Sequence, residues 1–275
     1  MIKDAIVNLP LHSKRDVVTP FATSFAGAYG AHLTGIAFRY VPVVAAEVLG
    51  LADPHFVERQ EAESKKAADE AVERLGFEIR REQVPWSSKQ IECSLEAAPG
   101  KFAEVAHAFD LVIVGQAGPD GSGVDDLIVE AALFVSGRPT LIVPYIQTEA
   151  FRTERVAICW DGSRPAARAA ADALALTKPN SAIHLVSILG ERELRQEIGG
   201  IDMAGHLARH GHKVTVHNPM LGANIASTIL NFVADNGIQF LVMGGYGHSR
   251  LREFVVGGVT RGILQSMTVP TLMSH

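Results

Sequence analysis

Glycine residues near the C-terminus have a spacing that can bring backbone N–H groups close to an anion. Gly244, Gly247 and Gly257 form the pattern G-x-x-G-x9-G immediately after the apolar run 240–243. Because glycine has no Cβ, a ligand can approach the backbone closely at the strand end, and again where a helix begins with free N–H groups. The spacing therefore indicates an anion site, although turns from strand to helix also need glycine for conformational reasons alone.

A carboxylate follows the first apolar run of the second half of the chain. The sequence reads Val156-Ala-Ile-Cys-Trp-Asp-Gly-Ser163, which places Asp161 at the end of an expected strand. Open parallel sheets bind ligands at the carboxyl ends of their strands, where Asp161 could accept hydrogen bonds from ribose hydroxyls or hold a metal ion bound to phosphates. The same Asp-Gly-Ser turn also suits a helix that Ser163 caps, so both interpretations stay open.

Similar segments recur in the two halves of the chain. Residues 110–115 and 240–245 are alike, and each precedes a proline-marked apolar run at a nearly equal interval. An internal repeat of this length indicates a tandem duplication. We therefore predict two domains, 1–148 and 149–275, joined by a short polar junction.

Apolar runs alternate with helical stretches in both halves. This alternation predicts an α/β fold in which each domain has five mostly parallel strands between helices. The expected strands of the first half are Ala5–Leu9, Leu33–Phe38, Glu78–Pro85, Leu111–Val114 and Thr140–Val143. Those of the second half are Arg155–Trp160, Ser181–Leu189, Lys213–Asn218, Phe240–Met243 and Thr271–Met273. Dense helix formers and spaced charges over 56–75 predict a long, partly solvated helix.

Three segments of the second half together resemble the universal stress protein family. They are the opening V-A-I-C-W-D-G-S, the run V-M-G-G-Y-G-H-S-R and the later G-G-V-T, and they occur in the family's order. With the duplication, the chain is identified as a tandem two-domain member of that family. The resemblance implies two Rossmann-like domains and, in one branch of the family, binding of ATP or a related adenine nucleotide, with or without Mg²⁺.

The resemblance also implies roles for individual residues. Asp161 matches the acid on the ribose or metal side, and Val186 matches the residue beside the adenine. The residues that match the ribose and phosphate loop and the anion-binding helix start are Met243, Gly244, Gly247, Gly257, Gly258, Val259 and Thr260. His248 and Arg250 are expected either to contact phosphate or to be solvated loop residues. Gly258 departs from the family's Ser or Thr, which removes one hydroxyl and weakens the expected contact by about 1 kcal/mol.

The first half departs further from the family pattern. Leu9 is expected at the position of Asp161, and the loop after Gly115 contains acidic residues where a phosphate would lie. Like charges repel an anionic ligand. We therefore predict that the first domain keeps the fold but not the ligand loop, and that nucleotide binding is confined to the C-terminal half.

Composition and charge exclude several classes of protein. The chain has 275 residues, of which 47% are hydrophobic, and a net charge of −5 without a stripe of Lys and Arg, which excludes a dedicated nucleic-acid surface. No apolar stretch approaches transmembrane length and no secretory signal is recognisable, so we expect a cytosolic protein without membrane contact. Cys93 and Cys159 have neither metal-ligand nor disulfide spacing and are expected to be reduced thiols.

Signals for catalysis and for metal binding are poor. The sequence contains no G-x-S-x-G elbow and no Walker-type G-x4-G-K-[S/T], so we name no catalytic residue. Slow ATP hydrolysis, or autophosphorylation at Ser249 or Thr260, is the most that an enzymatic role would include. His206 and His210 have the i, i+4 spacing of zinc ligands, but no nearby residue completes a set, so no metal site is predicted. His184 is expected to be a satisfied histidine of the sheet.

Two functions of different classes fit these observations. The first is a cytosolic stress-response protein whose C-terminal domain binds an adenine nucleotide and uses its occupancy to act on an unidentified protein partner. The alternative is a nucleotide-free interaction or scaffold module, with the loops serving only as structure. The family resemblance further implies that Thr140–Val143 and Thr271–Met273 pair within the chain, leaving a surface for a homodimer.

Overall fold

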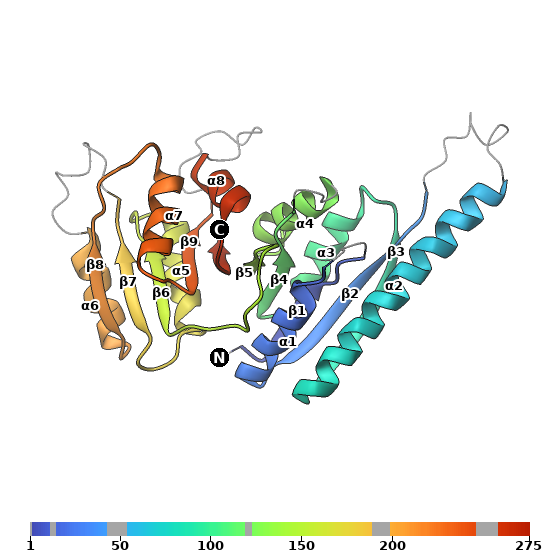
Figure 1. Ribbon diagram of the computed structural model, residues 1–275, viewed down its shortest axis with the longest axis horizontal. Helices are drawn as coiled ribbons and strands as arrows, with labels where there is room; N and C mark the ends of the chain where they lie inside the picture. Colours follow the sequence, from blue (N-terminus) through green and yellow to red (C-terminus); the bar gives the residue numbers. More distant parts are fainter. Residues whose placement is uncertain (1, 12–14, 43–53, 119–122, 189–198, 246–257) are drawn as a thin grey trace. The chain divides into compact units, whose positions relative to one another are not determined.

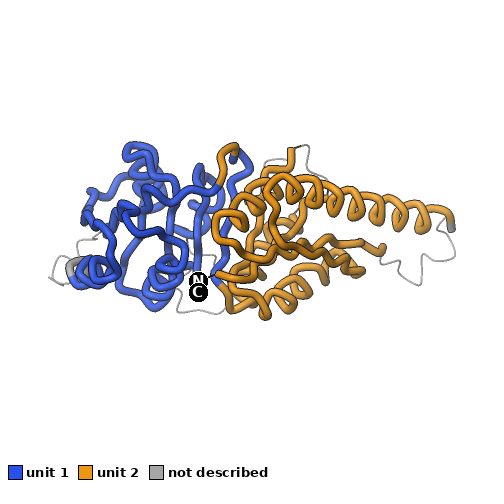
Figure 2. Tube along the Cα trace, turned by 90° about the horizontal axis from the view of Figure 1, so that it is seen from below, with its two compact units in different colours: residues 1, 139–147, 151–275 blue, residues 2–138, 148–150 orange. Residues whose placement is uncertain are grey.

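The chain forms two compact units (Figure 2). The computed structural model describes residues 2–11, 15–42, 54–118, 123–188, 199–245 and 258–275. The N-terminal unit, orange in Figure 2, consists of residues 2–138 and 148–150. The C-terminal unit, blue in the same figure, contains residues 139–147 and 151–275.

The N-terminal unit is a parallel sheet flanked by helices (Figure 1). Its described strands lie in the order β3-β2-β1-β4, and every neighbouring pair is parallel. Its strands are β1 (Asp4–Asn8), β2 (His32–Tyr40), β3 (Trp86–Cys93) and β4 (Leu111–Gly115). Its helices are α1 (Val18–Tyr29), α2 (Pro54–Glu82), α3 (Ala98–Ala106) and α4 (Gly123–Phe134).

The C-terminal unit repeats this arrangement and adds two strands, one parallel and one antiparallel. Its strand order is β5-β10-β9-β6-β7-β8, in which only the β5–β10 pair is antiparallel among the described pairs. Its strands are β5 (Thr140–Val143), β6 (Arg155–Cys159), β7 (Ala182–Val186), β8 (Lys213–His217), β9 (Phe240–Gly244) and β10 (Thr271–Ser274). Its helices are α5 (Arg164–Leu174), α6 (Gly199–Arg209), α7 (Ile225–Asp235) and α8 (Gly258–Ser266). The predicted α/β fold class is confirmed.

Helices cover both faces of the C-terminal sheet, which is why its central strands are apolar runs. Helix α5 packs on β9 and β10, whereas α7 contacts α8 and places Phe232 against the imidazole rings of His184 and His217. Residues 240–243 are all buried, as expected for a strand enclosed on two sides. Strand ends and the first turns of helices are thus the parts of this unit left to contact a ligand.

The strand expected at Glu78–Pro85 is wrong. Helix α2 continues to Glu82, because Leu75 and Ile79 follow Ala68 and Ala71 at helical spacing and are buried with them. The third strand is β3 at Trp86–Cys93, whose first four side chains are exposed at the edge of the sheet. The sequence of a polar edge strand contains no apolar run. The end of an amphipathic helix contains apolar residues and can therefore resemble a strand.

The predicted pairing of the two terminal strands is confirmed. Strand β10 pairs with β5 in antiparallel fashion, with Leu272 opposite Leu141 and Thr271 opposite Ile142. Segment 139–147, the end of the first sequence repeat, therefore belongs spatially to the C-terminal unit. The domain boundaries 1–148 and 149–275 describe the repeat in the sequence and stay a prediction.

No helix in the described ranges is both long and apolar enough to cross a membrane. Helix α2 has 29 residues, but its mean hydropathy is negative because Glu, Lys and Arg recur along it.

Candidate functional site

The turn after β6 presents a carboxylate at the end of the strand. Asp161 is exposed, and its Oδ1 accepts a hydrogen bond from the backbone N–H of Ser163 at 2.9 Å. Gly162 has φ +72°, a conformation that glycine adopts without strain. Ser163 then caps α5 by accepting a hydrogen bond from the N–H of Ala166 at 3.2 Å. The turn therefore has the predicted capping role and still leaves the Asp161 carboxylate at the surface.

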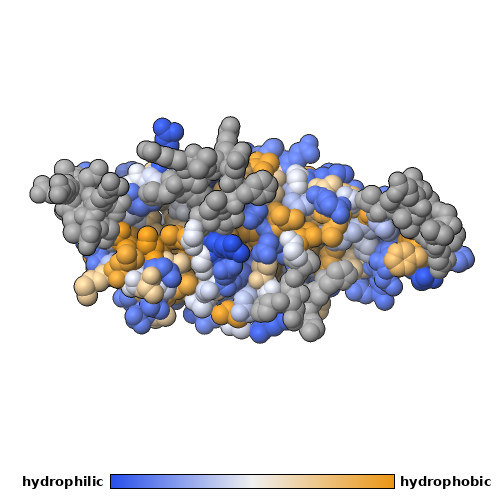
Figure 3. Space-filling model, turned by 90° about the horizontal axis from the view of Figure 1, so that it is seen from above, coloured by the Kyte–Doolittle hydropathy of each residue, from blue (hydrophilic) through white to orange (hydrophobic). Residues whose placement is uncertain are grey.

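The strand register brings the expected apolar contacts next to this turn. Cys159 pairs with Val186 on β7, and Ile158 pairs with Val242 on β9, so Met243 follows beside Cys159. Paired residues of neighbouring strands point to the same face of a sheet. Met243, Cys159 and Val186 therefore form a row on one face at the carboxyl ends of three adjacent strands. Figure 3 looks onto this edge, and apolar side chains show there beside the segments drawn in grey.

The thiol in this row is not ionised at neutral pH. Burial, with the Asp161 carboxylate as a smaller cause, raises the pKa of Cys159 to about 12. Because the thiolate is the nucleophilic form of cysteine, Cys159 offers a neutral, apolar contact rather than a nucleophile.

Gly244 is explained by packing between β9 and α5. A Cβ built on Gly244 would lie 2.5 Å from the backbone nitrogen of Ala166 and 2.7 Å from the carbonyl carbon of Pro165. No side chain fits there without moving the first turn of α5. The glycine is required by the fold, and its presence alone is not evidence for a ligand.

The first turn of α8 is open to a ligand. Nothing lies within 4 Å of a Cβ built on Gly258, and this residue is exposed. Val259 is half-buried and Thr260 is buried. Because β9 and β10 are parallel and α8 connects them, α8 begins at the same edge of the sheet as Asp161. The backbone N–H groups at a helix start and the positive end of the helix dipole would favour an anion.

The structure describes only part of the predicted set. It brings Asp161, Val186, Met243 and Gly244 together on three adjacent strand ends. Four further predicted residues lie outside the described residues, namely Gly247, His248, Arg250 and Gly257. Ser249, considered above as a hydroxyl for autophosphorylation, also lies outside them.

Comparison with known proteins identifies this half of the chain. Residues 152–275 match the model of the universal stress protein family. The C-terminal half of the chain belongs to this family. The curated universal stress protein Slr1230 of Synechocystis is 27% identical over 173 residues, covering 60% of this chain and 57% of the relative. The chain thus spans less than two thirds of that relative.

Solved universal stress proteins show that the fold extends over both halves. A universal stress protein of Archaeoglobus fulgidus has a TM-score of 0.75 at 13% identity, covering 98% of this chain and 97% of that chain. A protein of Pseudomonas aeruginosa has a TM-score of 0.61 at 13% identity, covering 98% of this chain and 92% of that chain. At such low identity the likeness concerns the fold alone.

The N-terminal unit lacks the carboxylate of the universal stress protein domain. Asn8 pairs with Ile36 as Cys159 pairs with Val186, and each following N–H donates to the paired residue's carbonyl. By this register Pro10 stands where Asp161 stands. The expected match of Leu9 with Asp161 is therefore wrong by one residue. An alignment of the apolar residues in the sequence does not determine the strand register. Pro10 has no carboxylate, so the expected difference between the halves persists.

Two histidines that the sequence did not connect meet at the end of the same row. His217 pairs with Val186 on β8, and its Nε2 lies 3.0 Å from Nδ1 of His184 on β7. Burial, followed by the His217 and Arg155 charges, lowers the pKa of His184. The sequence places one histidine in each of two expected strands. Their contact could not be predicted, because it depends on these two strands being neighbours in the sheet.

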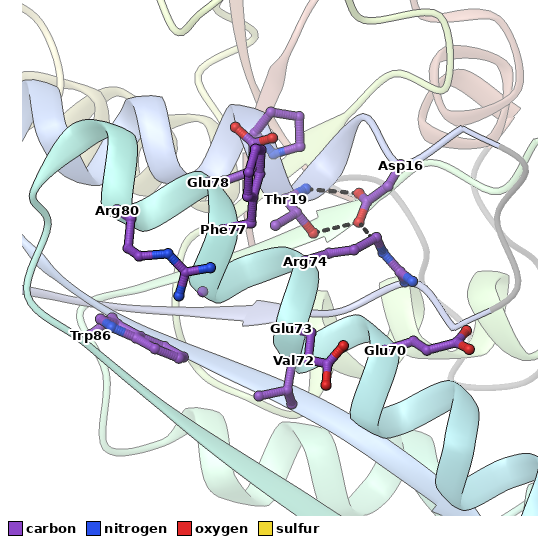
Figure 4. A pocket seen from close by; sticks show the side chains of 12 residues that line it. Asp16, Thr19, Glu70, Val72, Glu73, Arg74, Phe77, Glu78, Arg80 and Trp86 are labelled. Atoms are coloured by element: carbon purple, nitrogen blue, oxygen red, sulfur yellow. Dashed lines mark hydrogen bonds and ion pairs between the residues drawn. The ribbon is translucent and has the colours of Figure 1, made fainter.

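A separate surface groove of about 850 Å³ lies in the N-terminal unit (Figure 4). It is lined by α1, α2 and the beginning of β3, with Phe77, Arg80 and Trp86 around one part of it. On its other side Asp16 accepts hydrogen bonds from Thr19 and lies 3.5 Å from Arg74. None of the predicted nucleotide residues lines this groove. Within the described ranges no group of three or more His, Cys, Asp or Glu could hold a metal ion.

Proposed function

We propose that the C-terminal universal stress protein domain binds an adenine nucleotide, ATP or a relative of it, and that occupancy regulates a protein partner in the cytosol. The observation that carries the proposal is the meeting of Asp161, Val186 and Met243 on adjacent strand ends at the edge where α8 begins. Ligands of open parallel sheets bind at this edge.

In the proposed complex each part of the nucleotide would lie beside a different strand. Strand β9 and the start of α8 would face the phosphates, and Asp161 after β6 would accept hydrogen bonds from the ribose hydroxyls or bind Mg²⁺. The base would then lie over Val186 on β7. The strand sequence β9-β6-β7 therefore matches the linear order phosphate, ribose and base.

The surroundings of the first turn of α8 fit the phosphate end. Among the described residues, no atom lies within 4 Å of a Cβ built on Gly258, which would let a phosphate approach the backbone N–H groups of this turn. The missing Ser or Thr hydroxyl weakens the contact by about 1 kcal/mol, because one hydrogen bond to the phosphate is lost. The backbone donors persist, and we expect weaker binding than with the hydroxyl.

Isothermal titration of nucleotide-stripped protein with ATP and Mg²⁺ tests the proposal. We expect saturable binding near one equivalent, which Asp161→Ala weakens at least about tenfold because a charged hydrogen-bond partner is lost. Asp235→Ala is the matched control, since Asp235 is an exposed carboxylate at the end of α7 and is expected to leave binding unchanged. No heat and no thermal shift at millimolar ATP would refute the proposal.

The competing function is a nucleotide-free interaction module. It is favoured by the packing requirement at Gly244, which removes one ligand argument, and by the surface of the N-terminal unit. None of residues 55–66 of α2 is buried, and Phe77 and Trp86 are exposed beside the groove. A homodimer or a protein partner would use such surfaces. This function is the one to retain if the titration shows no binding.

A further inference from the structure

Two imidazole rings and a phenyl ring form a cluster at the end of the strand row. The His184 and His217 rings are inclined by 19°, with centroids 5.0 Å apart and the facing nitrogens at 3.0 Å. The Phe232 ring of α7 lies edge-on to both, with centroid distances of 6.1 Å to His184 and 4.9 Å to His217. Three rings in contact restrict the rotation of His217, so its remaining ring nitrogen Nδ1 has a defined position.

The cluster lies one strand beyond the base in the proposed nucleotide site. Phosphate, ribose and base would follow β9, β6 and β7, and the next strand in this direction is β8. His217 is the last residue of β8 and pairs directly with Val186. Both side chains therefore point to the same face, with backbones about one strand spacing of 4.8 Å apart. His217 is half-buried.

We propose that His217 closes the base end of this site and selects the base through its ring nitrogen, with His184 as the positioning residue. This inference rests on the proposed nucleotide site. The ligand class is a purine nucleotide, and the selected feature is the substituent at the purine C6 position. Val186 supplies the apolar contact to the ring, whereas His217 supplies the hydrogen bond that distinguishes one purine from another.

The hydrogen bond between the two rings couples their tautomers. A neutral imidazole has one N–H donor and one acceptor nitrogen. When His217 Nε2 donates to His184 Nδ1, His217 Nδ1 is an acceptor and can receive a hydrogen from the amino group of adenine. Hypoxanthine and guanine have an oxygen acceptor at the same position. Two acceptors facing each other repel, so this tautomer favours adenine. In the opposite tautomer His184 Nδ1 donates, His217 Nδ1 becomes a donor and a 6-oxo purine is favoured; the proposal takes the first tautomer, and tighter binding of inosine triphosphate would overturn it.

The experiment compares the dissociation constants of ATP and inosine triphosphate for matched variants. In the wild type we expect ATP to bind about tenfold more tightly, because inosine triphosphate would place an acceptor against the acceptor nitrogen of His217. His217→Phe keeps an aromatic ring against Phe232 but removes the nitrogens, and should bring the two constants close to equality. His184→Phe should reduce the preference less. It removes the hydrogen bond that fixes the tautomer of His217 but leaves the His217 imidazole in place.

Two further variants separate recognition from folding. His217→Asn keeps an amide oxygen that can accept the adenine hydrogen and should retain part of the preference. His206→Phe changes an exposed histidine of α6 and should leave the ratio as in the wild type. Thermal unfolding of every variant shows whether a lost preference reflects a lost fold.

The outcomes distinguish this inference from the function on which it rests. If Asp161→Ala abolishes ATP binding but His217→Phe keeps the wild-type ratio, the selection by His217 is wrong and the nucleotide site stands. A wild type that binds both nucleotides equally also overturns the selection. If the wild type binds neither nucleotide, the proposed function fails and the inference fails with it.

Discussion

The two units have the same strand order but differ where their strands end. In each, the strand after the first helix lies beside the first strand, and the fourth lies on its other side. Strands β7 and β8 end at Val186 and His217, whereas β2 and β3 continue four residues beyond the paired positions Ile36 and Lys89. The N-terminal unit therefore continues these two strands past the position at which the corresponding C-terminal strands end.

The extra residues of the N-terminal unit are packed rather than open. Phe38 is buried against Phe102, and the N–H of Tyr40 donates to Ser64 Oγ of α2 at 2.6 Å. Burial raises the pKa of the Tyr40 hydroxyl to about 12, with Asp125 and Cys93 as smaller causes. A half-buried, neutral phenol at the end of β2 fits a structural role for this edge.

The helix starts differ in charge. Helix α4 begins Gly123-Val124-Asp125-Asp126, whereas α8 begins Gly258-Val259-Thr260-Arg261. Acidic residues in the first turn stabilise a helix and repel an anionic ligand. Gly115 and Gly244, in contrast, serve the same packing need, because each would place a Cβ within 3 Å of the first helix of its unit, α1 or α5. The two units are therefore alike at the glycine that packs against the first helix, and they differ at the strand ends and at the helix starts.

The largest effect is expected at the shared packing glycine. Gly244→Val should cost about 3 kcal/mol of unfolding free energy, because its Cβ would meet the rigid backbone of α5. Gly115→Val should cost less, since the nearest atom, 2.8 Å away, is the movable Cγ2 of Val18. Urea unfolding measures both, with Gly258→Ala as a control that meets no atom within 4 Å. Equal costs at positions 244 and 258 would contradict the packing explanation.

Exchange of the helix-start charge should change nucleotide affinity. Gly258→Asp would give α8 a carboxylate like that of α4 and should weaken ATP binding by more than about tenfold, whereas isosteric Gly258→Asn should weaken it less. Gly258→Ser should strengthen binding about fivefold, by about 1 kcal/mol, since it supplies one hydroxyl. Titration calorimetry measures the series. An aspartate that leaves the affinity unchanged would show that phosphate does not bind at α8.

The first helices of the two units should differ in their dependence on capping. Asp16 accepts hydrogen bonds from the N–H groups of Val18 and Thr19 and from the Thr19 hydroxyl, whereas Ser163 accepts one from Ala166. Ser163→Ala should cost about 1 kcal/mol and Asp16→Ala up to about 2 kcal/mol. Denaturant unfolding of the two variants gives both costs, and a larger loss for Ser163→Ala would contradict this order.

The smallest effect is a dependence of stability on pH in the C-terminal unit. Burial is the main cause that lowers the pKa of His184 and of His212, so the unfolded chain binds more protons than the folded one. Stability is then complete above the unfolded pKa of about 6.5 and falls as the pH decreases below it. Between pH 7 and pH 5, the free energy of unfolding should fall less steeply with decreasing pH for His184→Phe than for His206→Phe. Equal slopes for the two variants would show that His184 does not cause the pH dependence.

Much of the fold could be predicted from the sequence because its signals are local. Apolar or alternating runs marked nine of ten strands, and the proline-marked runs led to the confirmed pairing of β5 with β10. The one strand that was missed, β3, is a polar edge strand whose place in the sheet depends on its neighbour β2. At the site, the sequence was sufficient to predict a carboxylate ligand at Asp161. It was not sufficient to predict the strand register that puts Pro10 at the matching position of the N-terminal unit.

The sequence by itself determined the α/β class, the duplication and the residues able to contact a nucleotide, because residue type and spacing along the chain are sufficient for these. The tertiary structure decided which side chains become neighbours. Only the pairing of β7 with β8 brings His184 to His217, and only the approach of α5 to β9 explains Gly244 as a packing residue. These contacts join residues far apart in the chain, and their distances depend on how strands and helices pack.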